Sequence, residues 1–392
     1  MKILIFAEVY YPDVMGGGEY STRQMAEGLV RKGHEVVVRC LGSSSRQEVI
    51  NGVRVKRKYI RGLSEHFLSN TKNNTVTDPF SQFDKITRKW GDLYPDRRWY
   101  ERYRRLIGKE KPDAVHTVSP MTYMGRMNLW RAAYDLKIPV SHVCRGPNLL
   151  ELKFLGGRLD GYNIRRNARA SRYLTALAAP SRFVLARHNR AGIRGRRYNE
   201  VICNAVDFEP VSISAAQIAQ KENRILYAGE IREGKGIRTL VQAVEGLEEV
   251  SLLLIGRGEP AENVRNAKVL GWMEREALFE YMKKAKAVVL PSEWEEPFGR
   301  ILIEAIYLGT IAIGSDRGGI PEVLNGNKDY IFHSGDAKGL RKRLERVLRM
   351  NTQEYMREVL LQQKTTAGST DEVYVDQWEK FFLRQLNEGY RT

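Results

Sequence analysis

The stretch from residue 287 to residue 324 constrains the fold of this chain more than any other part of the sequence. It begins with an apolar run at 287–290, continues with apolar residues at helical spacing over 301–308, and ends with a second apolar run at 311–314. The two short runs are typical of buried strands, and the spacing between them predicts a helix. Strand, helix and strand in this order make a βαβ unit, which predicts an α/β protein with a parallel sheet. Parallel sheets bind ligands at the carboxyl ends of their strands, so residues 291–300 are expected to line a binding site.

Two carboxylates mark this expected site. Glu296 lies in the loop before the helix, and Glu304 lies within the helix, with seven residues between them. Glu304 interrupts an apolar helix face, where a carboxylate needs a polar partner. The free backbone amides near Gly299, Arg300 and Ile301 carry the positive end of the helix and favour an anion. The spacing alone fits two interpretations: acids that hold hydroxyl groups beside a bound phosphate, or a solvated acidic loop and a helix glutamate in a salt bridge.

Three motifs in this stretch resemble those of a known family. Glu296-Pro297-Phe298-Gly299 is followed by Glu304 and then by Gly318-Gly319-Ile320-Pro321-Glu322. In this order they resemble the Glu-x7-Glu region of the retaining, nucleotide-sugar-dependent glycosyltransferases with the GT-B fold, the glycosyl transferases group 1 family. The resemblance covers nearly the whole chain and is weakest at 60–100 and 150–170.

The resemblance implies an α/β fold with two Rossmann-like domains that face each other across a cleft. A length of 392 residues also favours two domains. Asn204-Ala205-Val206-Asp207 resembles the end of the family's first domain. The expected parts are an acceptor-binding domain at 1–206, a nucleotide-sugar-binding domain at 207–370, and a helix at 371–392 that packs back on the first domain.

Composition places the chain among soluble globular proteins, because 42% of its residues are hydrophobic and 28% are charged. No apolar run approaches the ~18 residues that a membrane-spanning helix needs. The three cysteines are far apart and predict neither a disulfide framework nor a metal cluster. We therefore expect a cytoplasmic protein with no metal site and no cofactor.

The positive charge is concentrated in the first half of the chain. Residues 1–207 hold 38 Lys and Arg against 19 Asp and Glu, whereas residues 208–392 hold 26 against 28. A basic half predicts an anionic partner, and the charge leaves open a membrane surface, a nucleic acid or an acidic glycan. Residues 97–111 predict a helix with an aromatic face among arginines, and residues 158–197 hold a second arginine-rich run. The first pattern fits an interfacial membrane helix or, as we favour, a core helix with one solvated face.

A glycine loop follows the first predicted strand. Gly16, Gly17 and Gly18 let the backbone approach a ligand closely. The residues by themselves are equally compatible with a plain turn, and they match neither the Gly-x-Gly-x-x-Gly nor the phosphate-loop motif. The family resemblance implies that this loop faces the phosphates and the sugar of the donor.

Arg145 is the main departure from the family in the first domain. It follows the predicted strand at 138–144, at a place where the family often has a histidine that contacts the donor sugar. Arginine binds a carboxylate or phosphate through two hydrogen bonds but cannot act as a base. His142 lies inside the strand and is expected to be a packed histidine.

The resemblance assigns a diphosphate clamp to the second domain. The family has Gly-Arg-Leu followed by Lys-Gly, and here Lys235 matches the lysine while Glu230 replaces the arginine. Arg232 is an alternative second cation. Without the family, Lys235 is compatible with an ordinary surface lysine. Trp272 and Met273 follow a later strand and are expected to border the nucleotide base.

These motifs predict retaining glycosyl transfer from a nucleotide diphosphate sugar, the donor substrate, to a hydroxyl acceptor. Lys235, Arg232 and the helix amides near Gly299 would stabilise the charge on the departing diphosphate. Glu296 would hold hydroxyl groups of the sugar, and Glu304 would hold those of the ribose. No enzymic nucleophile is expected.

The basic half is also the predicted acceptor half, which favours an acceptor at an anionic membrane surface. We expect a lipid-linked glycan or a glycolipid as acceptor, and an enzyme bound peripherally to the inner face of the cell membrane. A nucleotide-sugar epimerase of the same architecture is the first alternative. A basic nucleic-acid-binding protein would leave the Glu-x7-Glu region unexplained, so no nucleic acid is expected as partner. A sugar-phosphate phosphorylase would need a cofactor-lysine motif that is not found.

Overall fold

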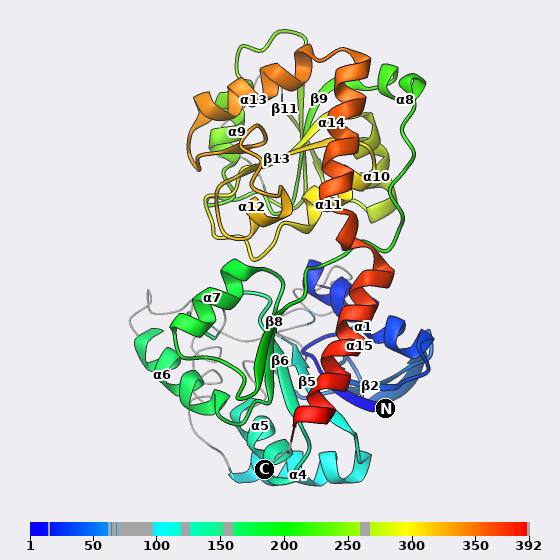
Figure 1. Ribbon diagram of the computed structural model, residues 1–392, viewed down its shortest axis with the longest axis vertical. Helices are drawn as coiled ribbons and strands as arrows, with labels where there is room; N and C mark the ends of the chain where they lie inside the picture. The colour runs from blue at the N-terminus through cyan, green and yellow to red at the C-terminus, as the bar shows by residue number, and fades with distance from the viewer. Residues whose placement is uncertain are drawn as a thin grey trace. The chain divides into compact units, whose positions relative to one another are not determined.

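The computed structural model describes residues 1–14, 16–61, 64, 68, 97–118, 126–147, 149–151, 160–258 and 267–389. The chain forms two compact units: unit 1 is Met1–Cys203 together with Asp371–Thr392, and unit 2 is Asn204–Thr370. Each unit contains one sheet with helices packed against it (Figure 1). The division falls after Cys203, a short distance before the boundary predicted after residue 206.

Unit 1 contains an eight-stranded sheet in the order β3-β4-β2-β1-β5-β6-β7-β8. All neighbouring strands are parallel except β3 and β4, which form an antiparallel hairpin. The strands are β1 (Lys2–Phe6), β2 (Glu35–Leu41), β3 (Arg46–Ile50), β4 (Val53–Lys58), β5 (Ala114–Val118), β6 (Val140–Val143), β7 (Ala176–Ala179) and β8 (Tyr198–Val201). The helices are α1 (Gly17–Arg31), α4 (Arg97–Glu110), α5 (Arg126–Asp135), α6 (Asp160–Ser171), α7 (Arg182–Arg190) and α15 (Asp371–Glu388).

The C-terminal helix α15 belongs to unit 1 and lies beside α1 (Figure 1). Its aromatic residues Trp378, Phe381 and Phe382 are buried. The two helices approach closely because α1 has a glycine at Gly28, where an added Cβ would lie 2.1 Å from Val375 Cγ2. The rings of Trp378, Phe381 and Phe382 lie edge-on to the ring of His116 on β5, so the same helix also packs on the sheet of unit 1.

Helix α4 packs its aromatic face into the interior of unit 1. Tyr103 and Ile107 are buried, and Trp99 packs against the same hydrophobic cluster. Its arginines are exposed on the opposite side. The favoured interpretation of residues 97–111 as a core helix with a solvated face is therefore confirmed.

Unit 2 contains a six-stranded sheet in the order β11-β10-β9-β12-β13-β14, and all of its neighbouring strands are parallel. The strands are β9 (Glu222–Ala228), β10 (Ser251–Ile255), β11 (Ala267–Gly271), β12 (Ala285–Leu290), β13 (Ile311–Ser315) and β14 (Ile331–Phe332). The helices are α8 (Ala215–Ala219), α9 (Ile237–Val244), α10 (Arg275–Lys284), α11 (Arg300–Tyr307), α12 (Ile320–Val323), α13 (Ala337–Arg349) and α14 (Thr352–Thr365), with a 3₁₀ turn at Ala367–Ser369.

The βαβ unit predicted at 287–324 is confirmed by β12, α11 and β13. Strands β12 and β13 are neighbours in the sheet and run parallel. Both are buried through most of their length, as their continuous apolar sequences predict. Among the described residues, no helix is long and apolar enough to cross a membrane.

Candidate functional site

The predicted donor-site residues of unit 2 lie in loops at the carboxyl edge of its sheet. Strands β9 and β12 are neighbours, so the loops that follow them, 229–236 and 291–299, begin side by side. The backbone carbonyl of Gly234 accepts hydrogen bonds from the amides of Glu293, at 3.0 Å, and Trp294, at 2.8 Å. The two loops are thus joined through their backbones.

Gly236 makes this close approach possible. Its φ is +70°, and a Cβ at this position would lie 1.8 Å from the carbonyl oxygen of Pro291. Any other residue would require the two loops to separate, and it would also adopt a backbone conformation that side chains disfavour. Lys235, which precedes this glycine, is therefore held over the loop that carries Glu296.

Glu296 is anchored through one of its two carboxylate oxygens. Lys235 Nζ lies 2.6 Å from Glu296 Oε1, and Ser292 Oγ donates to the same oxygen at 2.7 Å. The side chains of Lys235 and Glu296 are only 16% and 13% exposed. Glu296 Oε2 has no hydrogen-bond partner among the described residues, so it is available to accept a hydrogen bond from a ligand.

The second half of the motif holds the backbone of Glu296. The amide of Gly319 donates to the carbonyl of Glu296 at 2.7 Å. A Cβ on Gly318 would lie 2.1 Å from the same carbonyl oxygen, and the φ of Gly318 is +61°. The Gly318-Gly319 pair therefore fixes the loop that presents the carboxylate.

Glu304 is also anchored through a single oxygen. It is 7% exposed on α11, and its Oε1 accepts from Arg275 Nη2 at 3.1 Å and from Arg300 Nε at 3.2 Å. The partner that an apolar helix face requires is thus a pair of arginines. Within the described part of the chain, Glu304 Oε2 has no hydrogen-bond partner. The salt bridge expected for a helix glutamate is confirmed for Glu304, and the interpretation in which the two acids hold hydroxyl groups stays a prediction.

The start of α11 follows Glu296 closely in the chain and has the local features that favour an anion. Gly299 precedes the helix with a φ of +102° and directs the chain from the Glu296 loop into α11. The first amides of a helix have no partner within the helix and carry its positive end. The side chain of Phe298 is buried, and Ile301 packs against the hydrophobic cluster around β12, so both contribute to the position of this turn.

The predicted second cation of the clamp is paired on the surface. Arg232 Nε donates to Glu230 Oε2 at 2.7 Å, and the two side chains are 41% and 61% exposed. An exposed pair of this kind contributes only ~0–1 kcal/mol and opens readily. Trp272 is 38% exposed, whereas Met273 packs against a hydrophobic cluster that includes Met282.

In unit 1 the structure brings the glycine loop and Arg145 together. A Cβ on Gly18 would lie 3.4 Å from Arg145 Cδ, and Arg145 Nη2 lies 3.5 Å from the hydroxyl of Tyr374 on α15. The amide of Gly16 donates to Glu19 Oε2 at 2.8 Å, which places a carboxylate at the start of α1. Gly17 is the first residue of that helix.

The two histidines near Arg145 are packed residues. His142 is buried, and its Nδ1 lies 2.8 Å from Thr117 Oγ1, as expected for a packed histidine. His116 is also fully buried, and burial together with the nearby charge of Arg145 lowers the pKa of its imidazole to about 3. His116 is therefore neutral over the physiological pH range.

Several residues of this region were not predicted from the sequence. Ser292 and Ser315 are buried; Ser292 anchors Glu296, and Ser315 Oγ donates to the carbonyl of Ser292 at 2.6 Å. Arg275 contacts Glu304 from another helix. Ser292 lies close to Glu296 in the chain and offered a local signal, whereas the contact of Arg275 depends on how α10 packs on α11.

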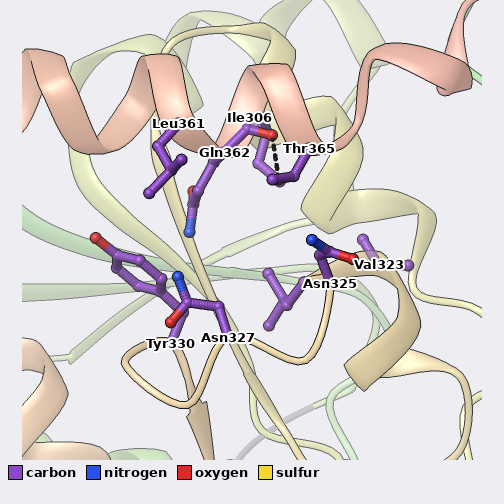
Figure 2. A pocket seen from close by; sticks show the side chains of 9 residues that line it. Ile306, Val323, Asn325, Asn327, Tyr330, Leu361, Gln362 and Thr365 are labelled. Atoms are coloured by element: carbon purple, nitrogen blue, oxygen red, sulfur yellow. Dashed lines mark hydrogen bonds between the residues drawn. The ribbon is translucent and has the colours of Figure 1, made fainter.

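A separate cavity of about 190 Å³ lies between α14 and the loop that follows α12 (Figure 2). Its polar walls are already used by the protein: the hydroxyl of Tyr330 donates to Glu358 at 2.6 Å, and the side chain of Gln362 bonds to the backbone of Ala312. None of the predicted site residues lines it. The lining residues are Ile306, Val323, Leu324, Asn325, Asn327, Tyr330, Leu361, Gln362 and Thr365.

Comparison with solved structures gives the fold class. Sucrose-phosphate synthase from Thermosynechococcus elongatus matches with a TM-score of 0.73 and 18% identity over 99% of this chain and all of that chain. The Anabaena protein HepE in complex with UDP matches with a TM-score of 0.69 and 14% identity over 98% of this chain and all of that chain. The predicted α/β fold of two Rossmann-like domains, the GT-B class, is confirmed.

Comparison of sequences gives the family. Residues 15–210 match the model of Glycosyltransferase Family 4, and residues 210–360 match that of Glycosyl transferases group 1. The chain therefore belongs to the group 1 glycosyltransferases and is an enzyme of that family. An uncharacterized glycosyltransferase of Methanocaldococcus jannaschii is 27% identical over 83% of this chain and 83% of its own length. These matches favour neither the epimerase nor the nucleic-acid-binding alternative.

Proposed function

We propose that this glycosyltransferase moves a sugar from a nucleotide diphosphate sugar to a hydroxyl acceptor with retention at the anomeric carbon. The observation that carries the proposal is the way in which the two carboxylate oxygens of Glu296 are bonded. Its Oε1 is held by Lys235 and Ser292, its Oε2 has no hydrogen-bond partner among the residues that the structure describes, and the positive end of α11 begins a few residues later. A carboxylate oxygen that can accept a hydrogen bond from a hydroxyl group, a cation and the positive end of a helix therefore belong to one small region of unit 2.

Each part of this arrangement suits one part of a nucleotide sugar. Glu296 Oε2 accepts a hydrogen bond from a sugar hydroxyl, and Glu304 Oε2 accepts one from the ribose. Lys235 and the amides at Gly299, Arg300 and Ile301 face the diphosphate, on which negative charge grows as the glycosidic bond breaks. Arg232 is a second cation when its exposed pair with Glu230 opens, and Trp272 and Met273 border the base.

Retention follows in this scheme because the acceptor attacks the anomeric carbon on the face from which the diphosphate departs. The transition state resembles an oxocarbenium ion, and an oxygen of the departing diphosphate takes the proton of the acceptor hydroxyl on the same face. Glu296 is anchored by a lysine and is used here as a hydrogen-bond acceptor rather than as a nucleophile. The anomeric configuration of the product, measured by nuclear magnetic resonance, should equal that of the donor; an inverted product would contradict this scheme.

We propose that a part of unit 1 also binds anionic groups of the substrates. Gly16, Gly17 and Gly18 would contact the phosphates and the sugar of the donor, and Arg145 would contact an acidic group of the donor sugar or the acceptor. The support is that Arg145 packs against Gly18 within the unit. A guanidinium beside a glycine loop is suited to an anionic ligand.

The donor proposal is tested by thermal stability in the presence of UDP, GDP and ADP. A ligand at ~100 times its dissociation constant adds ~2.7 kcal/mol to the free energy of unfolding, so one of the three should raise the melting temperature clearly. We propose that no metal or cofactor takes part. Excess chelator should leave transfer unchanged, and an inhibition that added magnesium reverses would contradict this point.

We further propose that the acceptor is a lipid-linked glycan or a glycolipid, used in cell-surface glycan synthesis at the inner face of the cell membrane. The support is the charge of the first half and the exposed arginines of α4. Because the aromatic face of α4 is inside the unit, contact with lipid would be electrostatic. Each basic residue near an anionic leaflet contributes ~1 kcal/mol, so a few suffice for reversible binding. Arg166 is buried and Arg187 pairs with Glu151, so neither is counted among them.

Co-sedimentation with vesicles tests this part. The protein should sediment with vesicles that contain anionic lipid, remain in solution with neutral lipid, and bind less as salt rises. The double substitution Arg104→Glu and Arg105→Glu on α4 should weaken binding strongly. The matched control is Arg349→Glu with Arg357→Glu in unit 2, where the side chains are 81% and 75% exposed. Equal loss in both pairs would show that only net charge matters, and no binding at low salt would favour a soluble acceptor.

A further inference from the structure

Arg275 connects Glu304 to a second carboxylate outside the predicted site. It is the first residue of α10, which packs on α11 in unit 2 (Figure 1). Arg275 Nη1 lies 2.6 Å from Asp207 Oδ1, and Arg275 Nη2 lies 3.1 Å from Glu304 Oε1. One planar guanidinium therefore bridges Asp207, near the start of unit 2, and the carboxylate on α11.

The guanidinium is fixed by packing as well as by charge. Its central carbon lies 4.8 Å from the centre of the Phe279 ring and 5.7 Å from that of Phe208. Arg275 is 18% exposed at its side chain, and Glu304 is 10% exposed. Stacking on two aromatic rings and bonding to two carboxylates leave a planar side chain little freedom.

The ion pairs favour the charged forms of Arg275 and Asp207 although both groups are partly buried. Burial opposes the charge of Arg275, but Glu304 and Asp207 outweigh it and raise the pKa of the guanidinium. Burial likewise disfavours an ionised Asp207, yet Arg275 lowers the pKa of that carboxyl. Arg275 and Asp207 therefore both remain charged at neutral pH.

The two arginines fix the orientation of the Glu304 carboxylate. Arg275 from α10 and Arg300 from α11 both bond to Oε1, from two different elements, which restricts rotation of the carboxylate. Oε2 has no hydrogen-bond partner within the described ranges. A carboxylate held in this way presents one hydrogen-bond acceptor, Oε2, in a fixed direction. Selective recognition of a hydroxyl group requires such a fixed acceptor atom.

We propose that Arg275, held in turn by Asp207, is a positioning residue that orients Glu304 toward the ribose hydroxyls and so makes the enzyme distinguish ribonucleotide donors from 2′-deoxyribonucleotide donors. The proposal rests on the proposed function, in which Glu304 binds the ribose. A site built to bind a hydroxyl rejects the analogue that lacks it, because its polar group is then left without a partner.

The competing explanation is that Arg275 only ties α10 to α11. Loss of such a tie would lower stability and weaken all nucleotides alike. A positioning role changes the ratio between ribonucleotide and deoxyribonucleotide affinities, which a general loss of stability leaves unchanged. That ratio is therefore the measurement that separates the two roles.

The experiment measures dissociation constants by titration calorimetry for UDP, GDP and ADP and for their 2′-deoxy forms, on the full chain. The wild type should bind its preferred ribonucleotide at least about 10-fold more tightly than the deoxy form, since a hydrogen bond to a charged group is at stake. Arg275→Met and Glu304→Gln should reduce that ratio toward one. Arg275→Lys, which keeps the charge but not the planar fork, should restore part of it.

The matched control is Arg346→Met. Arg346 also stacks on an aromatic ring, at 5.2 Å from the centre of Tyr330, and pairs with two carboxylates, Asp329 and Glu358. Its loss should lower stability without changing the ratio. Should Arg275→Met not fold, Asp207→Asn and Arg275→Lys provide the same test.

The outcomes are distinct. If none of the three nucleotides binds the wild type, the proposed function itself fails. If a nucleotide binds without any preference for the ribose form, or if the preference survives in Arg275→Met and Asp207→Asn, the proposed function stands and the role of Arg275 is overturned.

Discussion

Lys235 Nζ lies 2.6 Å from Oε1 of Glu296, so two residues 61 positions apart in the chain form one ion pair between two joined loops. Both side chains are mostly buried. In the proposed reaction they serve neighbouring parts of one ligand, the lysine on the diphosphate and the glutamate on the sugar. Their contact therefore places the group proposed to bind the diphosphate at hydrogen-bond distance from the group proposed to bind the sugar.

The first prediction concerns the carboxylate of Glu296. Glu296→Gln should reduce transfer about 10²–10³-fold, the usual effect of removing one group that stabilises a transition state, while the melting temperature changes little. Transfer is measured as release of nucleoside diphosphate from the donor in the presence of acceptor. The control is Glu295→Gln, the adjacent acid. Activity of Glu296→Gln near that of the wild type would show that the site is assigned wrongly.

The second prediction concerns Lys235. Lys235→Ala should raise the dissociation constant of the nucleoside diphosphate and slow turnover, at a cost of ~2.7–4 kcal/mol in transition-state stabilisation. It also leaves Glu296 without its cation, which adds repulsion between the carboxylate and the phosphates. Calorimetry and turnover rates measure both effects. Lys268→Ala, on the exposed face of β11, should have neither; a similar loss there would mean that the effect is one of general charge.

The third prediction compares two glycines of unit 2. Gly236 and Gly246 have φ values of +70° and +73°, but of the two only Gly236 has a close neighbour, since a Cβ added there would lie 1.8 Å from the carbonyl oxygen of Pro291. Alanine at either site costs ~1–2 kcal/mol for the left-handed backbone. Gly236→Ala should cost a further ~1–3 kcal/mol for the steric overlap and should also weaken nucleotide binding. Chemical denaturation measures the difference, and equal costs would contradict the close contact of the two loops.

The fourth prediction concerns Arg145. Arg145→Lys should lose much of the transfer activity, because a point charge does not reproduce the two-pronged hydrogen bonding of a guanidinium. The melting temperature is measured in parallel, because Arg145 also lies 3.5 Å from the hydroxyl of Tyr374 and its replacement can affect folding. The measurement is the turnover rate of Arg145→Lys and Arg145→His against wild type. Three equal rates would exclude a role for Arg145 in recognising an anion.

The fifth prediction follows from the lowered pKa of Asp207. Burial disfavours its charge, but Arg275 reverses the effect, so the folded pKa lies below the unfolded value near 3.8. The folded state then binds fewer protons, so the stabilisation is complete above about pH 5 and is lost as pH falls through the folded pKa. The stability difference between wild type and Asp207→Asn should therefore be constant from about pH 5 to 7 and shrink below about pH 4. Asp207 is 46% exposed, so the difference should be at most ~1 kcal/mol. A difference that grows on acidification would contradict the sign.

Prediction from sequence worked where the signal is local. Within residues 287–314, two continuous apolar runs predict the strands β12 and β13, and apolar residues at helical spacing between them predict α11. The aromatic and arginine faces of 97–111 likewise predict one buried and one solvated side of α4. The Gly318-Gly319 pair is recognised in the sequence only as part of a family motif, and its close contact with the carbonyl of Glu296 appears only in the structure.

The sequence by itself determined the α/β class, the order of the elements and the two carboxylates of the candidate site, since these depend on spacing within one segment. Only the tertiary structure decided which cation meets which carboxylate: Lys235 on Glu296, Arg275 on Glu304, and Arg232 on Glu230 rather than on the site. Such pairs join loops and helices whose meeting depends on strand order in the sheet and on how helices cross. No local propensity carries that information, because a lysine or arginine has the same preferences whichever carboxylate the packed core brings within its reach.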